Sequence, residues 1–324
     1  MIHPDRPALV LAPMDGITDA PMRALMGELG AFTHAVTEFV RVSAEPLSAR
    51  AFRREVPELA TDSRTPSGMP VQVQTLGGDP ERMALSARAA VEAGARSIDL
   101  NFGCPAPTVN RHDGGASLLR TPCRVRDVVR AVRDALPPEV PVSAKLRLGW
   151  DRTDTIDETA AMAAEGGAAW LTIHARTRVQ GYAPPVFWPA IGRVRRALDL
   201  PVVANGDLWT LDDLRRCRDE TGCVHFMLGR GAMADPTLPA RVARELGLPY
   251  PMPEGEPDWS FLLRRLVALS GENGKTLARM KGWLNLAHRF GGFQGFDDLK
   301  RAATVNELLS GLDCGFCVSG RSVT

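Results

Sequence analysis

The stretch Ser97-Ile98-Asp99-Leu100-Asn101-Phe102-Gly103-Cys104-Pro105 joins a short apolar run to a loop that contains a cysteine. The run 97–101 predicts a buried strand, and Gly103 with Pro105 predicts that the chain turns directly after it. A thiol between these two residues is poorly placed for core packing, although burial is the commonest fate of a free cysteine. In an α/β barrel this end of a strand carries the chemistry. Cys104 is therefore a candidate catalytic residue, with a structural thiol as the alternative.

Seven further apolar segments of similar length precede or follow this one, and most end in glycine, proline or polar residues. They are 9–14, 35–40, 71–76, 142–148, 171–174, 202–205 and 224–228. Many of the stretches between them predict helices, for example 81–94, 154–167 and 211–220, with acidic residues in the first turn and glycine at or after the end. Eight such repeats over about 240 residues predict an α/β fold, the (β/α)8 TIM barrel. A doubly wound open sheet is the alternative.

The composition is that of an ordinary globular protein, with 44% hydrophobic and 24% charged residues in 324. No apolar stretch is long enough to span a bilayer, and residues 1–7 lack the pattern of a signal peptide. Six cysteines do not form a disulfide framework. We expect a cytoplasmic protein without membrane contact.

The chain divides into three expected parts. Residues 1–245 form the barrel, residues 246–258 form a proline-rich linker, and residues 259–324 form a small helical domain with helices over 259–270, 277–290 and 296–309. From Trp259 onward the chain has nine Lys or Arg and five Asp or Glu, whereas the remainder carries a net charge of −3. A basic end on a slightly acidic body favours an anionic partner, with a solvated helical surface as the alternative.

Polar residues stand at several of the expected strand ends besides Cys104. Gln74, Lys145, His174 and Asn205 lie in or at the end of four segments. A lysine inside an apolar strand is costly without a partner, unless it reaches water at a sheet edge, and a closed barrel has no edge. His174 alone would more often be a core histidine. Its position among the other strand-end residues favours contact with a ligand.

Glycines follow the last two expected strands. Asn205-Gly206-Asp207 comes after the seventh and Gly229-Arg230-Gly231 after the eighth, where barrels commonly bind phosphate. Glycine lets backbone N–H groups approach the phosphate, and Arg230 adds charge. No Gly-X-Gly-X-X-Gly follows the first strand, which argues against a Rossmann fold. The pair Cys314 and Cys317 has no second pair at metal-site spacing, so we expect no metal.

Taken together, these segments resemble the tRNA-dihydrouridine synthase family. The matching motifs keep the family's order and spacing: Ala12-Pro13-Met14-Asp15-Gly16-Ile17-Thr18-Asp19, Thr37-Glu38-Phe39-Val40-Arg41, Val73-Gln74, Asn101-Phe102-Gly103-Cys104-Pro105, Lys145-Leu146-Arg147, His174-Ala175-Arg176-Thr177, Ala204-Asn205-Gly206 and Gly229-Arg230-Gly231. Residues 38–42, 63–68 and 148–150 are most similar to the bacterial C-type enzymes. The tail matches less closely, mainly through residues 278–283. One departure is Asp113, in a loop where the family usually has glycine.

The resemblance implies an FMN-dependent enzyme that reduces a D-loop uridine of tRNA, uridine 16 for the C-type, with NADPH as reductant. Flavin N5 would deliver hydride to C6, and Cys104 would protonate C5 as a general acid. The implied cofactor contacts are Pro13, Met14, Asp15, Gln74, Lys145, His174, Asn205, Gly206, Asp207, Gly229 and Arg230. The implied tRNA contacts are Arg41, Asn101, Arg176, Arg279, Lys281 and Arg289.

We expect the enzyme to act as a monomer. Two other functions remain open at this point. One is a flavin barrel that acts on a free pyrimidine, which would need neither the basic tail nor Arg41. The other is a tRNA-binding factor without catalysis, although Cys104, Lys145 and the phosphate turn are all present.

Overall fold

The computed structural model of the protein describes residues 1–111, 114–250 and 258–315. Three features singled out in the sequence fall outside this part of the chain: Asp113, residues 251–257 of the linker, and Cys317. The helix α10 (Leu238–Glu245) precedes the linker, and the helix α11 (Trp259–Ser270) follows it.

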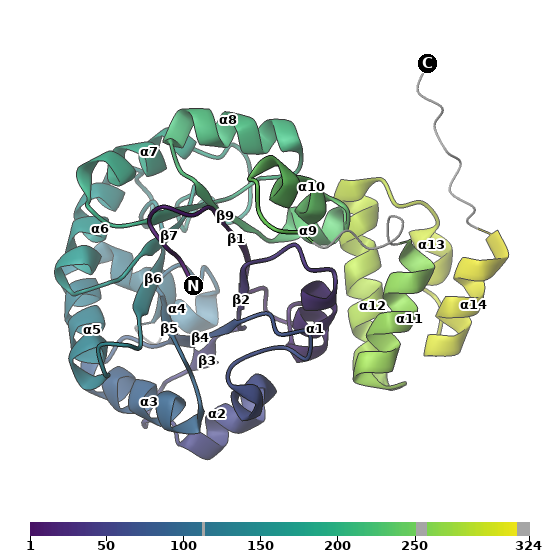
Figure 1. Ribbon diagram of the computed structural model, residues 1–324, viewed down its shortest axis with the longest axis horizontal. Coiled ribbons are helices and arrows are strands. Elements are labelled where there is room, and N and C mark those ends of the chain that lie inside the picture. Colours follow the sequence, from purple (N-terminus) through teal and green to yellow (C-terminus); the bar gives the residue numbers. More distant parts are fainter. Residues whose placement is uncertain (112–113, 251–257, 316–324) are drawn as a thin grey trace.

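Eight parallel strands close into a barrel (Figure 1), so the predicted (β/α)8 fold is confirmed. They are β1 (Ala8–Leu11), β2 (His34–Val36), β4 (Val71–Leu76), β5 (Ile98–Asn101), β6 (Val142–Arg147), β7 (Leu171–His174), β8 (Val202–Asn205) and β9 (His225–Leu228). Pairing of β2 with β4 and of β1 with β9 joins the two ends of the sheet. The open-sheet alternative is excluded because these pairings leave none of the eight strands at a free edge. A short additional strand, β3 (Val40–Arg41), lies along β4.

Alternate residues of each strand face outward and pack against a ring of helices. The ring is formed by α1 (Ala20–Glu28), α2 (Ala49–Glu55), α3 (Pro80–Ala93), α5 (Pro122–Ala135), α6 (Thr155–Glu165), α7 (Trp188–Ala197), α8 (Leu211–Thr221) and α10. Outward residues such as Leu9, Leu100 and Ile173 are fully buried in the main core. This alternation is the consequence of the period of two in a strand, which places neighbouring side chains on opposite faces.

The helices begin and end where capping residues stand. Asp79 accepts a hydrogen bond from Arg82 N at 2.9 Å and starts α3. Thr210 and Asp213 form a reciprocal capping box at the start of α8, and Gly222 ends that helix with a φ of 66°. Such caps satisfy N–H and C=O groups that the helix itself leaves unpaired. The helices predicted over 81–94, 154–167 and 211–220 are confirmed to within two residues at each end.

The inside of the barrel has an apolar side and a polar side. The apolar cluster consists of Val10, Ala12, Val36, Trp170, Val203 and Met227, and Met1 and Ile2 pack against it. Figure 1 shows the N-terminus over the centre of the barrel. The strands β4, β5 and β6 instead turn polar side chains inward: Gln72, Gln74, Asp99, Asn101, Ser143 and Lys145. This polar side leads to the carboxyl ends of the strands.

Two predicted strands differ from the structure. Residues 12–14 leave β1 for a loop, and the segment 35–40 contains the end of β2 followed by three residues before β3. The loop is held by Thr18, whose hydroxyl oxygen accepts from Met14 N at 2.7 Å. Because this local hydrogen bond replaces the sheet ladder, the apolar run 9–14 does not continue as a strand.

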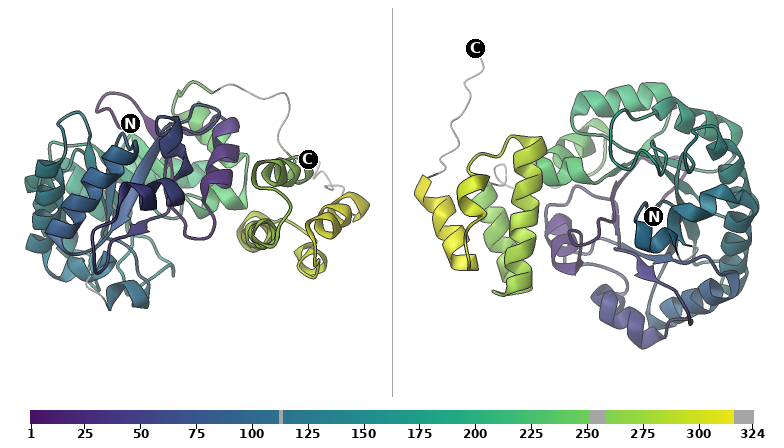
Figure 2. Two further views of the ribbon diagram at one scale, coloured as in Figure 1. Left: turned by 90° about the horizontal axis from the view of Figure 1, so that it is seen from below. Right: turned by 180° about the vertical axis from the view of Figure 1, so that it is seen from behind.

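The C-terminal helices lie together at one side of the barrel, next to α1 and α9 (Arg230–Ala234), as Figures 1 and 2 show. They are α11, α12 (Gly274–Leu286), a π-helical turn η3 (Ala287–Gly291), α13 (Phe296–Leu299) and α14 (Val305–Gly315). The predicted helices 277–290 and 296–309 are therefore each divided in two. Gly291 lets the end of η3 lie against α9, since a Cβ at this position would lie 1.8 Å from Ala234 O.

Polar contacts help to attach these helices to the barrel. Trp283 Nε1 donates to Met233 O at 2.9 Å, and Arg265 forms an ion pair with Glu28 at 2.7 Å. Arg279, with only 12% of its side chain exposed, pairs with Asp19 at the start of α1. Arg279 therefore holds the two parts of the chain together.

A buried ion pair between α1 and the 3₁₀ turn η1 (Pro57–Thr61) gives a test of the fold. Arg23 binds both carboxylate oxygens of Glu58 at 2.8 Å, and the two side chains are 2% and 6% exposed. We predict that Glu58→Ala lowers the free energy of unfolding by about 3–5 kcal/mol, because it leaves a buried guanidinium without its carboxylate. Denaturant unfolding measures the change. Glu55→Ala, which removes an exposed partner of Arg54, is the control, and an equal effect of both variants would contradict the prediction.

Candidate active site

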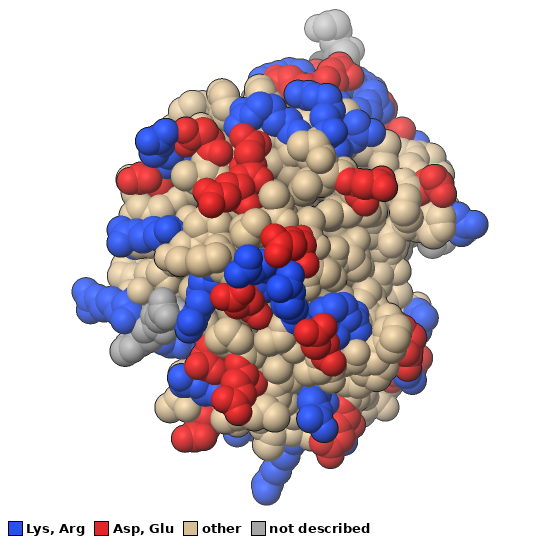
Figure 3. Space-filling view, turned by 90° about the vertical axis from the view of Figure 1, so that its left-hand side faces the viewer, with Lys and Arg blue, Asp and Glu red and all other residues tan. Residues whose placement is uncertain are grey.

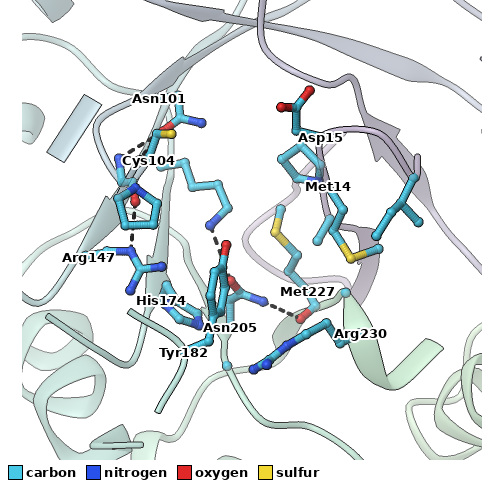
Figure 4. Close-up of a pocket in the computed structure, with 18 of the residues that line it drawn as sticks. Met14, Asp15, Asn101, Cys104, Arg147, His174, Tyr182, Asn205, Met227 and Arg230 are labelled. Atoms are coloured by element: carbon cyan, nitrogen blue, oxygen red, sulfur yellow. Dashed lines mark hydrogen bonds between the residues drawn. The ribbon is translucent and has the colours of Figure 1, made fainter. Parts of the chain in front are cut away.

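A cavity of about 360 Å³ opens at the carboxyl ends of the barrel strands (Figure 4). Its walls contain thirteen residues that the sequence analysis selected: Pro13, Met14, Asp15, Gln74, Asn101, Cys104, Lys145, His174, Asn205, Gly206, Asp207, Gly229 and Arg230. Barrel enzymes use this end for binding and catalysis because loops from all the strands converge there. The structure therefore brings the candidate cofactor residues and the candidate acid into one cavity.

Cys104 lies in the loop after β5, and Asn101 determines the path of that loop. Asn101 Oδ1 accepts hydrogen bonds from Gly103 N at 2.9 Å and from Cys104 N at 3.0 Å. On the other side, Ala116 N donates to Cys104 O at 3.2 Å. Gly115 has a φ of 59°, and a Cβ there would lie 3.1 Å from Cys104 Cβ. The backbone around the thiol is thus fixed from both sides.

The Cys104 thiol keeps its proton at neutral pH. Burial raises its pKa above the ordinary value, and the positive charges of Arg147 and Lys145 oppose this rise without cancelling it. A thiol with a raised pKa is a poor nucleophile but a competent proton donor. The site is therefore suited to general acid catalysis by Cys104.

Lys145 places a cation in the floor of the cavity. Its Nζ donates to Asn205 Oδ1 at 3.3 Å, and Asn205 Nδ2 donates in turn to Met227 O at 2.9 Å. Burial, with Arg147 nearby, lowers the pKa of Lys145, while Asp99 opposes this shift. The amide of Asn205 is held by its two neighbours, so the ammonium group has a defined position in front of the strands.

His174 lies at the end of β7, where it is 7% exposed. Burial and four neighbouring cations hold its pKa well below the ordinary value, so the ring is neutral at physiological pH. Its Nδ1 is buried without a hydrogen-bond partner in the described structure. Gly206 packs on the ring so closely that a Cβ at this position would lie 3.2 Å from His174 Cδ2. An unpaired buried nitrogen beside a glycine turn indicates a place for a ligand.

Two arginines share one carboxylate at the far end of the cavity. Asp207 accepts from Arg176 Nη1 at 2.9 Å and from Arg230 Nη2 at 3.0 Å. The guanidinium of Arg230 also lies over the rings of Tyr182 and Trp209, at 4.8 and 5.1 Å from their centroids. Two positive charges against one negative charge leave a net positive charge, which favours an anionic ligand group.

Arg176 was expected to contact tRNA, and its position contradicts that expectation. Its side chain is 1% exposed and is occupied by Asp207 and by Ala183 O, to which Nε donates at 2.7 Å. No part of the guanidinium is left for a macromolecule outside the barrel. Arg176 instead orients Asp207, and through it Arg230.

The other expected tRNA residues lie outside the cavity, apart from Asn101. Arg41 is half-buried beside the opening and donates to Thr108 O at 3.4 Å. Lys281 Nζ donates to Ala302 O at 2.5 Å, and Arg279 is the ion-pair partner of Asp19. Arg289 is exposed, with its guanidinium 5.3 Å from the centroid of Phe290. Arg279 and Lys281 thus make contacts within the chain, and Arg289 remains open to solvent.

Arg147 is a site residue to which the sequence analysis gave no role. Its Nε donates to Gly103 O at 2.8 Å, and its Nη1 donates to Thr177 O and Gly181 O at 3.0 and 2.7 Å. Although it is 3% exposed, it has no carboxylate partner among the described ion pairs. The signal that could have revealed it is its position two residues after Lys145, which gives it the same inward direction on β6.

Arg120 and Arg178 form a second cluster that the sequence analysis did not select. Their guanidinium carbons lie 3.8 and 4.6 Å from the ring centroid of Trp150. In the described structure neither has a carboxylate partner. The three residues follow β5, β6 and β7, so they lie at the same end of the barrel as the cavity. This cluster, called the Trp150 cluster below, is a site of uncompensated positive charge.

The fold and the cavity together define an enzyme of the (β/α)8 barrel class. The chain belongs to the dihydrouridine synthase family, because the family model described as Dihydrouridine synthase (Dus) matches residues 10–307. The family and the enzymatic character expected from the sequence motifs are thereby confirmed.

Several curated relatives are similar over most of the chain. A protein of Ralstonia nicotianae named tRNA-dihydrouridine(16) synthase is 44% identical over 287 residues, which is 87% of each chain. A protein of Pseudomonas putida with the same name is 47% identical over 235 residues, covering 72% of this chain and 73% of the relative. Among solved structures, a 2-naphthoyl-CoA reductase complex is 10% identical with a TM-score of 0.56. It covers 74% of this chain and 50% of that one, and this likeness shows the fold alone.

The raised pKa of Cys104 gives a test that needs no substrate. Iodoacetamide reacts with thiolates, so a raised pKa means that the alkylation rate of Cys104 reaches half of its maximum at a higher pH than for N-acetylcysteine. Mass spectrometry of the Cys104 peptide across a pH series measures this midpoint. A midpoint at or below that of the free compound would contradict a protonated acid at neutral pH.

Proposed function

We propose that the protein reduces uridine 16 in the D-loop of tRNA to 5,6-dihydrouridine, with FMN bound in the cavity and NADPH as reductant. The observation that carries the proposal is the half-buried thiol of Cys104, whose pKa is raised by burial, in the wall of a cavity that also contains Lys145 and the glycine turns. The relatives named tRNA-dihydrouridine(16) synthase support the choice of substrate and position.

The residues of the cavity fit FMN. The unpaired Nδ1 of His174 provides a hydrogen-bond partner for a ligand, and Gly206 lets the turn after β8 approach the ring closely. Gly229 packs as closely on the loop after β1, since a Cβ there would lie 3.3 Å from Met14 Sδ. We assign the phosphate end to His174, Asn205, Gly206, Asp207, Gly229 and Arg230, and the ring to Pro13, Met14, Asp15, Gln74 and Lys145. The net positive charge around Asp207 suits the phosphate.

Bound and reduced FMN would supply the hydride that the C5–C6 bond of uracil requires. The protein supplies the proton: Cys104 donates it to C5 and becomes a thiolate. The positive charges of Arg147 and Lys145 stabilise that thiolate, because both lower the pKa of Cys104. The same residues therefore permit a thiol that is protonated at rest and able to release its proton.

The substrate must enter as an extruded base. A uridine within a stacked loop cannot reach the floor of a barrel, so it leaves the stack and enters the cavity. Asn101 lies in the wall next to Cys104, in a position to hydrogen-bond the edge of the base. The guanidinium of Arg147 fixes the loop between Thr177 and Gly181, and Tyr182 follows that loop into the cavity wall.

Phosphates of tRNA require cations that have no carboxylate partner. The side of the barrel seen in Figure 3 offers few, because positive and negative side chains alternate there and pairs such as Arg193–Asp157 form across neighbouring helices. Arg41, Arg289 and the Trp150 cluster lack such partners in the described structure. We therefore propose that tRNA lies over the cavity end of the barrel, between these cations.

The proposed substrate indicates where the enzyme acts. No helix in the described ranges has the length and apolar character needed to cross a bilayer. Leu286 of α12 completes the wall of the cavity. We propose a cytoplasmic monomer, since its substrate is tRNA.

The first test concerns the acid. We predict that Cys104→Ala retains its FMN but forms dihydrouridine at least 100-fold more slowly, because loss of a general acid costs about 10²–10⁴-fold. The flavin spectrum gives the cofactor content, and mass spectrometry of tRNA nucleosides gives the product. Cys123→Ala, at an exposed position on α5, is the control. A wild-type rate for Cys104→Ala would exclude Cys104 as the general acid. Activity of the wild type on free uridine would favour an enzyme that acts on free pyrimidines.

The second test concerns the Trp150 cluster. We predict that the double variant Arg120→Gln, Arg178→Gln binds tRNA more weakly and that the slope of log K against log salt becomes shallower by about one to two, because two phosphate contacts are lost. Filter binding at several salt concentrations measures both quantities. Arg193→Gln, on the outer helices, is the control. Superimposable salt curves for the double variant and the wild type would show that the cluster only packs against Trp150.

A further inference from the structure

A chain of hydrogen bonds connects the buried carboxylate of Asp99 to the backbone of Cys104. Gln74 Nε2 donates to Asp99 Oδ2 at 2.7 Å, and Asn101 Nδ2 donates to Gln74 Oε1 at 2.8 Å. Asn101 Oδ1 then accepts from Gly103 N and Cys104 N at 2.9 and 3.0 Å. Asp99 is 2% exposed. It is the inward-facing residue of β5 that precedes Asn101, two positions earlier in the strand. It touches no reacting group, and neither family resemblance nor sequence motif gave it a role.

The two ends of this chain fix the same direction. At one end, backbone N–H groups can only donate, so the oxygen of the Asn101 amide must face them. At the other end, an ionised carboxylate can only accept, so the nitrogen of the Gln74 amide must face Asp99. The hydrogen bond between Gln74 and Asn101 satisfies both conditions, because a nitrogen donor of Asn101 faces the oxygen acceptor of Gln74 and neither two donors nor two acceptors meet. Reversal of either amide would therefore break hydrogen bonds throughout the chain.

Neighbouring residues hold Asp99 in its accepting state. Ser143 Oγ donates to Asp99 Oδ1 at 2.5 Å, and Gln72 Nε2 donates to Ser143 Oγ at 3.0 Å. Strand register accounts for this arrangement, because Gln74 and Ser143 lie opposite Asp99 on the strands to either side. Burial raises the pKa of Asp99 to about 6, and the hydrogen bonds from Ser143 and Gln74 and the charge of Lys145 oppose this rise, so the carboxylate is mostly ionised at neutral pH. Both carboxylate oxygens are therefore occupied by donors.

We propose that Asp99 is a positioning residue for the reaction: through Gln74 it sets the direction of the Asn101 amide, which holds the Cys104 loop. This inference rests on the proposed role of Cys104 as the acid. The same direction leaves Asn101 with one unused N–H, which Figure 4 shows at a side-chain nitrogen directed into the cavity. Asp99 thus determines where the thiol lies. It also determines that Asn101 offers the cavity a hydrogen-bond donor, which is the group that a carbonyl oxygen of the base requires.

The test exchanges donor and acceptor within the chain. In Asp99→Asn, the side chain keeps an acceptor on only one side. With its oxygen toward Ser143, its nitrogen meets the Gln74 nitrogen; with its oxygen toward Gln74, the Ser143 hydroxyl loses its acceptor. The direction is therefore no longer fixed. In Gln74→Glu, two carboxylates meet. In the double variant Asp99→Asn, Gln74→Glu, the new amide nitrogen at position 99 donates to the new carboxylate at position 74, and that carboxylate accepts from Asn101. The new amide oxygen at position 99 accepts from Ser143. The double variant therefore restores the direction of Asn101 with the chemical groups reversed.

Two measurements follow the full-length protein with its bound flavin. The first is the rate of dihydrouridine formation at saturating tRNA in a single turnover, with tRNA affinity and FMN content determined separately. The second is the alkylation rate of Cys104 at fixed pH, which reports the position of the thiol without any turnover. For each single variant we expect a single-turnover rate at least about tenfold lower, because small displacements of reacting groups are costly. The alkylation rate should change, and tRNA affinity should stay within about twofold.

The double variant should recover most of both losses. Gln74→Glu, Asp99→Leu is the matched control. It relieves the repulsion between carboxylates but supplies no donor, so the buried carboxyl at position 74 takes up a proton, can donate as well as accept, and no longer fixes the direction of Asn101. This control should not recover. Ser143→Ala removes a hydrogen bond to Asp99 on the side away from Asn101 and should change the turnover rate less than Asp99→Asn does. If Asp99→Asn does not fold, the comparison of Gln74→Glu with the two double variants carries the test.

The outcomes separate the inference from the proposed function. Additive losses in Asp99→Asn, Gln74→Glu, or equal recovery by the control that carries Asp99→Leu, would overturn the inference and leave Asp99 as a buried polar group of the barrel. Absence of dihydrouridine formation by the wild type would overturn the proposed function. In that case the alkylation rates alone still decide whether Asp99 positions the Cys104 loop.

Discussion

Closure of the parallel barrel is the constraint on which the rest of the structure depends. Once β2 pairs with β4, the eight barrel strands have no free edge, and an inward polar side chain cannot reach water along the sheet. Each such group must find a partner on a neighbouring strand or at the cavity. Gln72, Ser143, Asp99 and Gln74 satisfy one another in this way, and Lys145 reaches Asn205. The polar side of the barrel is therefore a connected network rather than a set of independent residues.

The same constraint explains the electrostatics of the site. Low exposure raises the pKa of Cys104 and lowers that of His174, so both are neutral at physiological pH although they stand beside several cations. Burial acts in opposite directions on an acid and a base, yet in both cases it favours the uncharged form. The cations in the cavity wall, Lys145, Arg147 and Arg230, have backbone, amide or carboxylate partners. A site for an anionic cofactor and a proton donor results from one physical cause.

The fold and most of the cavity residues could be predicted because the ends of the strands can be recognised in a single sequence. Apolar segments with polar residues at their ends identified Gln74, Cys104, Lys145, His174 and Asn205, and closure brought them together. The partners of arginines could not be predicted in this way. Arg176 is separated by 31 residues from Asp207, and Arg279 by 260 residues from Asp19, so local pattern gives no sign that their charges are used within the chain. The packing of η3 against α9 likewise depends on the approach of Gly291 to Ala234, a contact between distant segments.

The C-terminal helices take part in the cavity itself. Leu286 lies in its wall, and the ring of Phe290 lies 5.8 Å from the guanidinium carbon of Arg230 while it stacks on Trp209 at 4.9 Å. These helices are therefore not an interchangeable module on a self-sufficient barrel. A chimera that replaces them to redirect the enzyme toward another RNA would also remove one wall of the cavity and one of the rings around Arg230. Evolution of a new target in this architecture must accordingly alter the far helices while it preserves the turn that faces the barrel.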